Sequence, residues 1–300
     1  MIVFIRKLSL FILFNVAVFC LLVYIFNSPI KSFPLRNWET ESNLFVIEEG
    51  QHYDCVILGA STGRVLSRNG NHITTESLLE KKILNLAQGK GSGGLEKNLL
   101  YFSYFLNKSN KTKEVLYFLP PQSLYTDFYD NLNMKAEPFR WEFFLHMINM
   151  KIDVGTIFNY IQSKISFNWF ETANIKSNKR VLTSIDTSAI RKNLAIWNSY
   201  EISYPAEPYE KLEHLDHIIE LSKKNNIVLN IVIMPSLLSS IYRHEETMKY
   251  LKEFVRYDNV QLWDFSKSIK DPKFYYDHVH LNSAGARKFC SLELYKVFED

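Results

Sequence analysis

The sequence predicts an α/β fold in which a parallel β-sheet is covered by helices on both faces. Short apolar segments rich in β-branched residues alternate along the chain with longer segments that carry apolar residues at helical spacing. The apolar segments are nearly continuous, which is typical of strands buried on both sides of a parallel sheet. In such sheets ligands bind at the carboxyl ends of the strands, so a site is expected in the loops that follow them.

Five segments are predicted to be strands, because each is short and apolar and is followed by a turn signal or a helical pattern. The strands are expected at residues 53–58, 83–87, 114–119, 227–234 and 260–263. Helices are expected directly after residue 63 and at 95–106, 208–224, 236–255 and 283–298. Residues 122–205 interrupt this alternation, since they are rich in Phe, Trp, Tyr and Asn and contain no convincing strand. This segment is interpreted as a helical, aromatic-rich insert.

The first 27 residues are predicted to form a transmembrane helix. No charged residue occurs between Leu8 and Phe26, and about 20 apolar residues are enough for a helix to cross a bilayer. Arg6 and Lys7 precede this segment and favour the cytoplasmic side, so the rest of the chain is expected outside the cytoplasm, in the periplasm or at the cell surface. A cleaved signal sequence is the alternative, but it would have small residues near its end. We expect a single-pass signal anchor at 1–27, a linker at 28–50 and a folded domain at 51–300.

Composition and charge exclude several classes of protein. The chain has 47% hydrophobic and 22% charged residues and a formal charge of +3, which is typical of a folded globular protein. Lys and Arg are spread along the chain, so nucleic acid is not expected as a partner. Cys20, Cys55 and Cys290 lack the spacing of a zinc site or a disulfide framework. No metal and no cofactor are predicted.

Two short motifs carry residue types suited to nucleophilic catalysis. The motif Gly59-x-Ser61-x-Gly63 lies where the first strand meets a helix, a position that exposes a hydroxyl and directs N–H groups at a developing oxyanion. Asp277 and His280 lie three residues apart in a loop after the last strand. A serine needs a base to take its proton, and a histidine needs a carboxylate to fix its tautomer. The pattern therefore predicts a catalytic triad of these three residues, provided that the first and last strand ends converge.

The same segments resemble the SGNH (GDSL-like) hydrolases. The sequences GASTGR, NLAQGKGSGG and DHVHLNSAGARKF look like the first, second and last blocks of that family. The resemblance covers residues 53–119 and 227–297 and leaves the insert unmatched. It implies a flavodoxin-like three-layer fold, with Ser61 as nucleophile, His280 as general base and Asp277 as the partner that orients the histidine.

The oxyanion-binding residues are where the chain departs from the family. The resemblance implies the N–H groups of Ser61 and Gly89 as oxyanion donors. The family usually has G-x-N-D after the third strand, whereas this chain has LPPQS at residues 119–123. The asparagine is missing, and Gln122 is the candidate to replace it. Loss of one oxyanion donor typically costs about 3 kcal/mol in the transition state. The missing asparagine therefore bears on catalytic activity more than on the fold.

Several alternatives stay open at this point. An α/β-hydrolase also uses G-x-S-x-G, but several strands precede its serine. Asp277, His278 and His280 could instead bind a metal, although no second ligand cluster is evident. Arg64 either binds an anionic substrate group or begins a solvated helix face, and Lys90 either adds charge near the cleft or is a solvated loop residue. Aromatic side chains of the insert either stack on sugar rings or fill a core; they are Trp141, Phe143, Phe144, Phe167, Trp169 and Phe170.

The expected function is that of a serine-dependent acyl-ester hydrolase or O-acyltransferase acting on a cell-envelope glycan. The triad depends on residues and spacing, the compartment on the anchor, and the glycan on the resemblance to membrane-tethered members of the family. Expected partners are the membrane, an acylated glycan or other ester substrate, and a membrane acyl-donor protein. The alternatives are a catalytically inactive binding or assembly protein of an envelope polysaccharide system and a lipid or thioester hydrolase.

Overall fold

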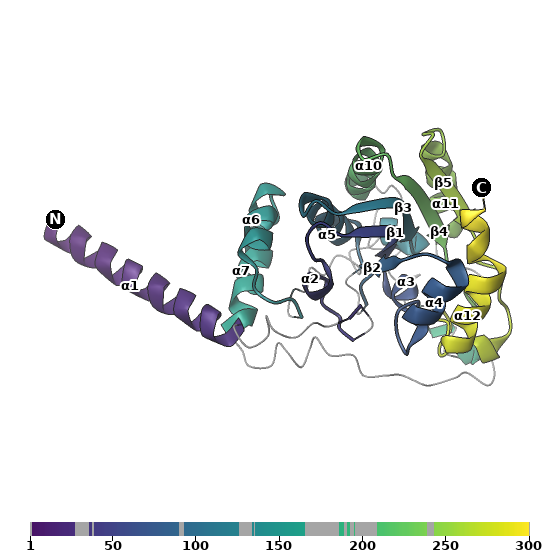
Figure 1. The fold of residues 1–300 in the computed structure, drawn as a ribbon, viewed down its shortest axis with the longest axis horizontal. Coiled ribbons are helices and arrows are strands. Elements are labelled where there is room, and N and C mark those ends of the chain that lie inside the picture. Colours follow the sequence, from purple (N-terminus) through teal and green to yellow (C-terminus); the bar gives the residue numbers. More distant parts are fainter. Residues whose placement is uncertain are drawn as a thin grey trace.

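The computed structural model describes most of the chain. The described residues are 2–27, 36–37, 39–89, 93–125, 134, 136–165, 186–188, 191–192, 195, 209–238 and 243–299. Within this part the domain is built on one parallel sheet, and an apolar helix at the amino terminus projects away from the domain (Figure 1).

The sheet has five parallel strands in the order β2-β1-β3-β4-β5. The strands are β1 (His52–Gly59), β2 (Ile83–Asn85), β3 (Lys111–Phe118), β4 (Val228–Ile233) and β5 (Val260–Asp264). All five predicted strands are present. Their boundaries differ from the predicted ones by two residues or fewer, except that β3 begins three residues earlier. The predicted α/β fold is confirmed, and its sheet order is consistent with a flavodoxin-like or SGNH-type fold.

Helices cover both faces of this sheet and form a separate hydrophobic core on each. Within β1, Cys55 and Ile57 point to one core, whereas Val56 and Leu58 point to the other. One face is covered by α2 (Asn43–Val46), α5 (Leu95–Asn107), α10 (Tyr209–Lys224) and α11 (His244–Phe254), and the other by α3 (Ser61–Arg64), α4 (Asn71–Leu79) and α12 (Ser283–Leu292) (Figure 1). This alternation explains why the strands are apolar at nearly every position.

Three of the predicted helices differ in extent from the observed ones. The helix expected at 236–255 begins only at His244, and residues 236–238 at the predicted start are not helical. The helix expected at 283–298 ends at Leu292 and is followed by the 3-10 helix η6 (Leu294–Phe298). The helix after the serine turn, α3, is a single turn of four residues. Two further 3-10 helices are η2 (Pro121–Leu124) and η5 (Pro272–Phe274).

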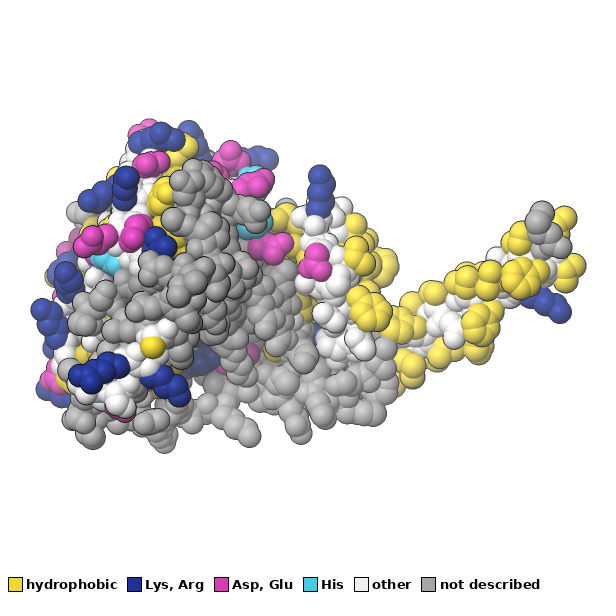
Figure 2. Space-filling view, turned by 180° about the vertical axis from the view of Figure 1, so that it is seen from behind, with side chains coloured by type: hydrophobic (Ala, Val, Ile, Leu, Met, Phe, Trp, Pro, Cys, Tyr) yellow, Lys and Arg dark blue, Asp and Glu magenta, His cyan; other side chains and the backbone are white. Residues whose placement is uncertain are grey.

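The amino-terminal helix α1 (Ile2–Asn27) is apolar on all sides. Its segment Ile2–Leu22 has a mean hydropathy of 2.1 and is entirely exposed, so by length and composition it is able to cross a membrane. Figure 2 shows hydrophobic side chains along the visible side of the helix. Because the domain buries none of the segment Ile2–Leu22, α1 is suited to be a membrane anchor or a signal sequence.

The sequence predicts a linker over residues 28–50, but the described part of this segment is built into the domain. Leu44 in α2 and Ile47 just after it are fully buried in the core. The Asn43 side chain donates to the carbonyl of Leu86 at 2.8 Å. The segment has no clear apolar periodicity because polar side chains hold much of it in place, which is why its sequence resembles a linker.

The described part of the insert is a helical hairpin that packs against α5. It consists of α6 (Trp141–Asn149), α7 (Val154–Gln162) and the 3-10 helix η4 (Ser163–Ile165). Phe143 is fully buried, with its ring centroid 5.6 Å from that of Tyr101 and 5.0 Å from that of Tyr104. For Phe143 the core interpretation is therefore confirmed, whereas Trp141 is 61% exposed. Phe167, Trp169 and Phe170 lie outside the described residues.

Candidate active site

The serine turn at the end of β1 is pressed against β3, and its two glycines make this possible. Gly59 has φ +123°, and a Cβ at this position would lie 2.1 Å from the carbonyl oxygen of Phe118. A Cβ on Gly63 would lie 2.8 Å from the Phe118 ring. Only glycine allows such contact. Both glycines of the motif therefore let Ser61 begin α3 directly at the carboxyl end of β1.

A buried asparagine links the serine turn to the glycine-rich segment that follows β2. The Asn98 side chain, on α5, accepts a hydrogen bond from the N–H of Gly59 at 2.7 Å. Its amide donates to the carbonyls of Gly93 and Gly94 at 2.9 and 2.8 Å. At Gly93 the chain passes so close that a Cβ would lie 2.3 Å from Cα of Ala60. Asn98 therefore fixes the position of the turn that carries the serine.

The three residues predicted to form a triad lie in one hydrogen-bonded chain. Ser61 Oγ lies 2.6 Å from His280 Nε2, and His280 Nδ1 lies 2.7 Å from Asp277 Oδ2. The second carboxylate oxygen of Asp277 accepts hydrogen bonds from the N–H groups of Val279 and His280 at 2.9 and 2.8 Å. The two motifs, 219 residues apart at Ser61 and His280, are thus brought together where the strands end.

An asparagine just before α12 helps to hold the loop that carries Asp277 and His280. The Asn282 side chain accepts hydrogen bonds from the N–H groups of Ala284 and Gly285, both at 3.0 Å, and so caps the helix. Its amide group donates to the carbonyls of Lys273 and Tyr275. Asn282 thereby closes the loop on both sides of the histidine.

The electrostatics around Asp277 keep the carboxylate ionised. Burial raises the pKa of Asp277, but hydrogen bonds from the His280 ring and from two backbone N–H groups outweigh burial and leave the pKa below its ordinary value. Tyr276 stacks on the His280 ring with the centroids 5.1 Å apart and the planes 11° from parallel. Burial and the charge of Asp277 raise the pKa of Tyr276 to about 12, so its phenol is neutral at physiological pH. The histidine is held between a charged acceptor and a neutral ring.

Two other hydrogen bonds between a serine hydroxyl and a histidine ring occur in the described residues, but their serines are buried. Ser67 Oγ lies 2.8 Å from His72 Nδ1, and Ser103 Oγ lies 2.9 Å from the ring of His146. Ser67 is only 1% exposed, whereas the side chain of His280 is 17% exposed. Accessibility therefore distinguishes the pair at Ser61 from the pair at Ser67.

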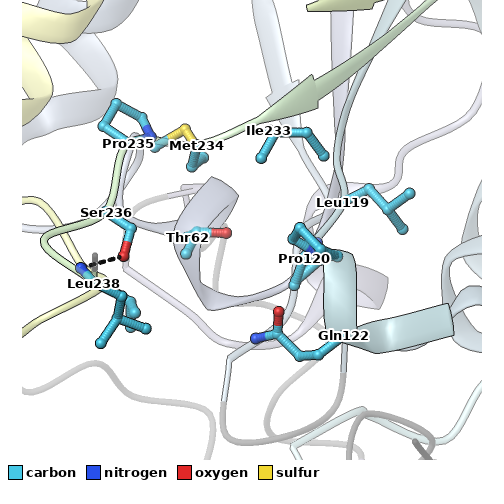
Figure 3. Close-up of a pocket in the computed structure, with 11 residues that line it drawn as sticks. Thr62, Leu119, Pro120, Gln122, Ile233, Met234, Pro235, Ser236 and Leu238 are labelled. Atoms are coloured by element: carbon cyan, nitrogen blue, oxygen red, sulfur yellow. Dashed lines mark hydrogen bonds between the residues drawn. The ribbon is translucent and has the colours of Figure 1, made fainter. Parts of the chain in front are cut away.

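A small, mostly apolar cavity opens beside the serine. It has a volume of about 50 Å³ and lies between the ends of β3 and β4 (Figure 3). Thr62, which follows the serine, and Val279, which precedes the histidine, both line it. The other lining residues are Leu119, Pro120, Pro121, Gln122, Ile233, Met234, Pro235, Ser236 and Leu238.

The candidate oxyanion donors lie in the neighbourhood of the serine turn. Ser61 begins α3, and the first N–H groups of a helix have no partner inside it. The N–H of Gln88 donates to the carbonyl of Gly59 at 3.0 Å, which holds the chain just before Gly89 close to the turn. Gln122 lies in η2, and Figure 3 shows its side chain at the cavity together with Thr62. The oxyanion roles of Ser61, Gly89 and Gln122 stay predictions.

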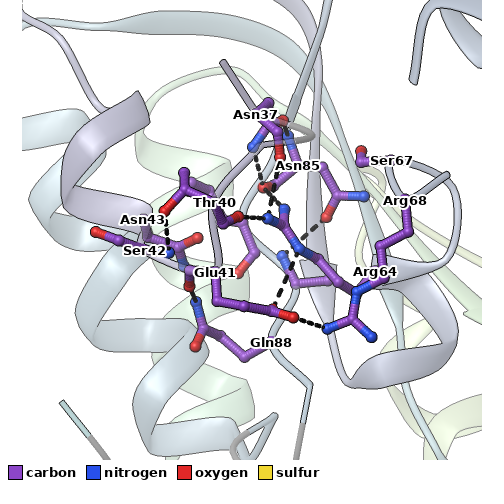
Figure 4. Close-up of polar contacts among 12 residues, drawn as sticks. Asn37, Thr40, Glu41, Ser42, Asn43, Arg64, Ser67, Arg68, Asn85 and Gln88 are labelled. Atoms are coloured by element: carbon purple, nitrogen blue, oxygen red, sulfur yellow. Dashed lines mark hydrogen bonds and ion pairs between the residues drawn. The ribbon is translucent and has the colours of Figure 1, made fainter. Parts of the chain in front are cut away.

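Arg64 neither begins a solvated helix face nor is free to bind a substrate anion, because it is 1% exposed and surrounded by carbonyl groups. Its guanidinium donates to the carbonyls of Asn85 and Asn37, both at 3.0 Å, and to that of Thr40 (Figure 4). Burial lowers the pKa of Arg64 to about 10, so the side chain remains charged. Carbonyl oxygens in a buried site are polar partners that compensate such a charge. Arg64 therefore fastens the segment before β1 to the serine helix.

Arg68 lies one turn further along the chain and forms an ion pair with Glu41 (Figure 4). Its guanidinium lies beside Gly89, where a Cβ would come within 2.8 Å of Nη2. Lys90, predicted either to add charge or to be solvated, lies outside the described residues. Among the described residues, Arg68 is thus a cation beside Gly89 of the second block, and the sequence analysis did not single it out.

The remaining polar candidate is His278, and its backbone contacts the chain that follows β4. The carbonyl of His278 accepts a hydrogen bond from the N–H of Leu237 at 2.9 Å, and the residue is 8% exposed. In the part of the chain that is described, no group of three or more His, Cys, Asp or Glu side chains is arranged to hold a metal ion. Sequence reasoning missed Asn98 and did not foresee the buried role of Arg64, because a lone polar residue in a helix pattern gives no signal of burial.

The fold and the site thus define an α/β protein with a serine, a histidine and an aspartate in one hydrogen-bonded chain at the carboxyl ends of a parallel sheet. No protein-family model matches the chain, and no curated protein matches it.

Proposed function

We propose that this protein is a membrane-anchored SGNH-type enzyme that removes or transfers a small acyl group on a cell-envelope glycan. The observation that carries the proposal is the hydrogen-bonded chain from Ser61 through His280 to Asp277. The order of the strands supports it, because the serine follows the first strand and the acid and base follow the last one, as the resemblance implies.

The contacts suit acyl transfer through a covalent intermediate. Ser61 Oγ attacks the carbonyl carbon of the ester while His280 Nε2 takes the hydroxyl proton, and Asp277 stabilises the imidazolium that forms. The carbonyl oxygen becomes an oxyanion, for which the N–H groups of Ser61 and Gly89 are the proposed donors. The leaving alcohol receives the proton from His280. Water then completes hydrolysis, or a glycan hydroxyl completes transfer, by the reverse sequence of steps.

The cavity beside the serine supports a short acyl group. Its volume is about 50 Å³, whereas a cavity of about 150 Å³ accommodates a benzene molecule. A group of roughly two or three carbon atoms fits this space by the same scale. The apolar lining from Leu119, Ile233 and Met234 suits a methyl or ethyl end rather than a charged one.

The compartment and the glycan rest on two further arguments. Helix α1 has the length and hydropathy of an anchor, and the two positive residues before its apolar run favour an extracytoplasmic domain. Resemblance to membrane-tethered SGNH domains that modify envelope polysaccharides supplies the glycan as substrate class. A membrane protein that delivers the acyl group is the expected donor for the transfer reaction.

Labelling of the full chain with a fluorophosphonate probe tests the proposal. We expect labelling at Ser61, located by peptide mapping, and its loss in Ser61→Ala and in His280→Ala. The matched control is Ser67→Ala, because Ser67 also contacts a histidine but is buried, so labelling should persist. In the same samples, an acetyl ester should be turned over faster than an octanoyl ester, and Ser61→Ala should lower turnover by about 10⁴-fold or more.

Each other outcome points to a different function. Faster turnover of the octanoyl ester would favour a lipid or thioester hydrolase. A folded protein that the probe does not label would favour the inactive binding or assembly protein, for which the missing third-block asparagine is the motivating observation.

A further inference from the structure

The hairpin of α6 and α7 carries an exposed apolar face that the candidate active site does not use. On α6, Trp141, Leu145 and Ile148 are spaced by four and three residues and are 61%, 42% and 47% exposed. On α7, Val154 and Phe158 are spaced by four residues and are 82% and 62% exposed. Residues with this spacing share one side of a helix. We call these five side chains the outer face of the hairpin.

The hairpin is fixed to the domain by its opposite side. Phe143 and Met147 of α6 are fully buried in the core that α5 shares. Tyr160 of α7 is also fully buried, and its hydroxyl donates to the carbonyl of Pro138 at 2.8 Å and accepts from the N–H of Arg140 at 2.9 Å. The outer face is therefore exposed although the hairpin that carries it is packed against the domain.

Among the described residues, large exposed apolar side chains outside α1 are concentrated here. Nine such residues occur, and five of them belong to the outer face, within 18 residues of chain. The other four are more scattered: Ile73 and Leu78 lie on α4, Val255 follows α11 and Leu292 ends α12. Single exposed apolar residues are ordinary on protein surfaces, whereas a gathered set marks an interaction site.

The position of the hairpin indicates which partner it meets. The 3-10 helix η4, which continues α7, contacts α1. Figure 1 shows the α6–α7 pair standing beside the end of α1 where the helix reaches the domain, and Figure 2 shows hydrophobic side chains on the hairpin next to those of α1. The hairpin that carries the outer face thus ends against a helix that is long enough to span a bilayer.

We propose that the outer face of the hairpin lies in the interfacial layer of the membrane that α1 enters. A helix with one apolar side and one packed side, carrying Trp and Phe toward the lipid, is suited to the boundary between headgroups and acyl chains. Trp141 is at the amino end of α6, where its ring stacks on Phe144 at 5.1 Å and its indole N–H is free to meet headgroups or water. The hairpin and α1 then hold the domain at the bilayer by two attachments.

This inference requires that α1 stays in the membrane, but it does not depend on the chemistry of Ser61. The chain offers a direct test, because Cys55 and Cys290 are buried and Cys20 is the one exposed thiol among the described residues. In a Cys20→Ser background, Leu145→Cys and Phe158→Cys each carry an environment-sensitive NBD fluorophore on the outer face. Ile73→Cys on α4 and Leu292→Cys on α12 are matched controls, since both positions are also exposed apolar residues on helices.

The full chain is reconstituted in nanodiscs of phosphatidylcholine and phosphatidylglycerol, with and without lipids that carry a spin label near the headgroup. We expect strong quenching of NBD at positions 145 and 158 and little at 73 and 292. Equal, weak quenching at all four positions would overturn the proposal. Crosslinking between two copies through position 145, without quenching by lipid, would overturn it in favour of a dimer interface. Probe labelling of Ser61 in the same nanodiscs reports separately on the proposed enzyme.

Discussion

The serine turn and the α6–α7 hairpin are both packed against the same domain, but by different means. The serine turn is held by backbone contact at Gly59, by the hydrogen bond that Gly59 N–H donates to Asn98, and by the bond that Arg64 donates to the Asn85 carbonyl. The hairpin is held by aromatic rings around Phe143 and leaves its other side exposed. One region is fixed mainly by backbone contact and polar groups with specific directions. The other is fixed mainly by apolar burial, to which the hydrogen bonds of Tyr160 and His146 add.

This difference teaches which parts of the molecule tolerate change. A turn in which backbone atoms touch has no space for an additional methyl group, because protein interiors are close-packed. The free side of a helix that is held on its other side by rings tolerates most substitutions except proline without loss of folding stability. The substitutions below are chosen to test this contrast, in order of decreasing effect on the free energy of unfolding.

Replacing Gly59 should have the largest effect. The Cβ of Gly59→Ala would lie 2.1 Å from the Phe118 carbonyl oxygen at φ +123°, so β1 and β3 must separate at their ends. We expect a loss of about 4 kcal/mol or more in denaturant unfolding. Gly70→Ala is the matched control, because φ there is +75° but a Cβ would meet nothing within 4 Å, and only a strain of about 1 kcal/mol is expected. Equal losses in the two variants would show that backbone contact is unimportant.

Within the hairpin, two positions on the same helix should behave differently. Phe143→Ala removes a fully buried ring and should lower the free energy of unfolding by about 3–5 kcal/mol. Leu145→Ala removes a side chain that is 42% exposed, and a change of less than about 1 kcal/mol is expected in detergent. A large loss at Leu145 would mean that the outer face is packed against protein.

The polar packing behind the serine turn should make stability depend on pH. Burial, with a contribution from the positive Arg64, lowers the pKa of His72 from 6.5 to about 4. Between these values the unfolded chain binds a proton that the folded chain excludes, so the free energy of unfolding falls as pH decreases from 6.5 towards 4. The loss attributable to this group is at most about 3 kcal/mol.

His72→Gln measures that contribution. Its unfolding free energy, followed by denaturant titration over the same pH range, should decline less steeply than that of the unchanged chain. Parallel pH profiles for the two proteins would contradict a neutral, buried His72. Phe143→Leu should leave the slope unaltered, since no proton is exchanged at that ring.

Much of the architecture could be predicted from the sequence because it depends on local patterns. Apolar runs such as 227–234 revealed the strands, and glycines revealed the turn before Ser61. Because the carboxyl ends of parallel strands meet at one edge of the sheet, two distant motifs were enough to predict the contact between Ser61 and His280. The catalytic roles of the triad and of the oxyanion donors stay predictions.

What could not be predicted depends on contacts between distant polar residues. Asn37, Thr40 and Asn43 read as linker residues, yet they are 7% exposed or less. Glu137 of the insert accepts hydrogen bonds from the Ser42 hydroxyl and from the N–H of Leu44. Such side chains are buried because residues distant in the sequence form hydrogen bonds with them. Hydrophobic periodicity does not identify those partners.

The packed segment before β1 also limits the distance between α1 and the domain that carries Ser61. Asn37 is already buried, and Arg64 donates a hydrogen bond to its carbonyl. The chain between α1 and the packed domain is therefore only residues 28–35. Even fully extended, this stretch reaches roughly 30 Å. If α1 stays in the bilayer, this stretch keeps the domain close to the lipid surface. The proposed enzyme would then reach only those substrates that approach the membrane.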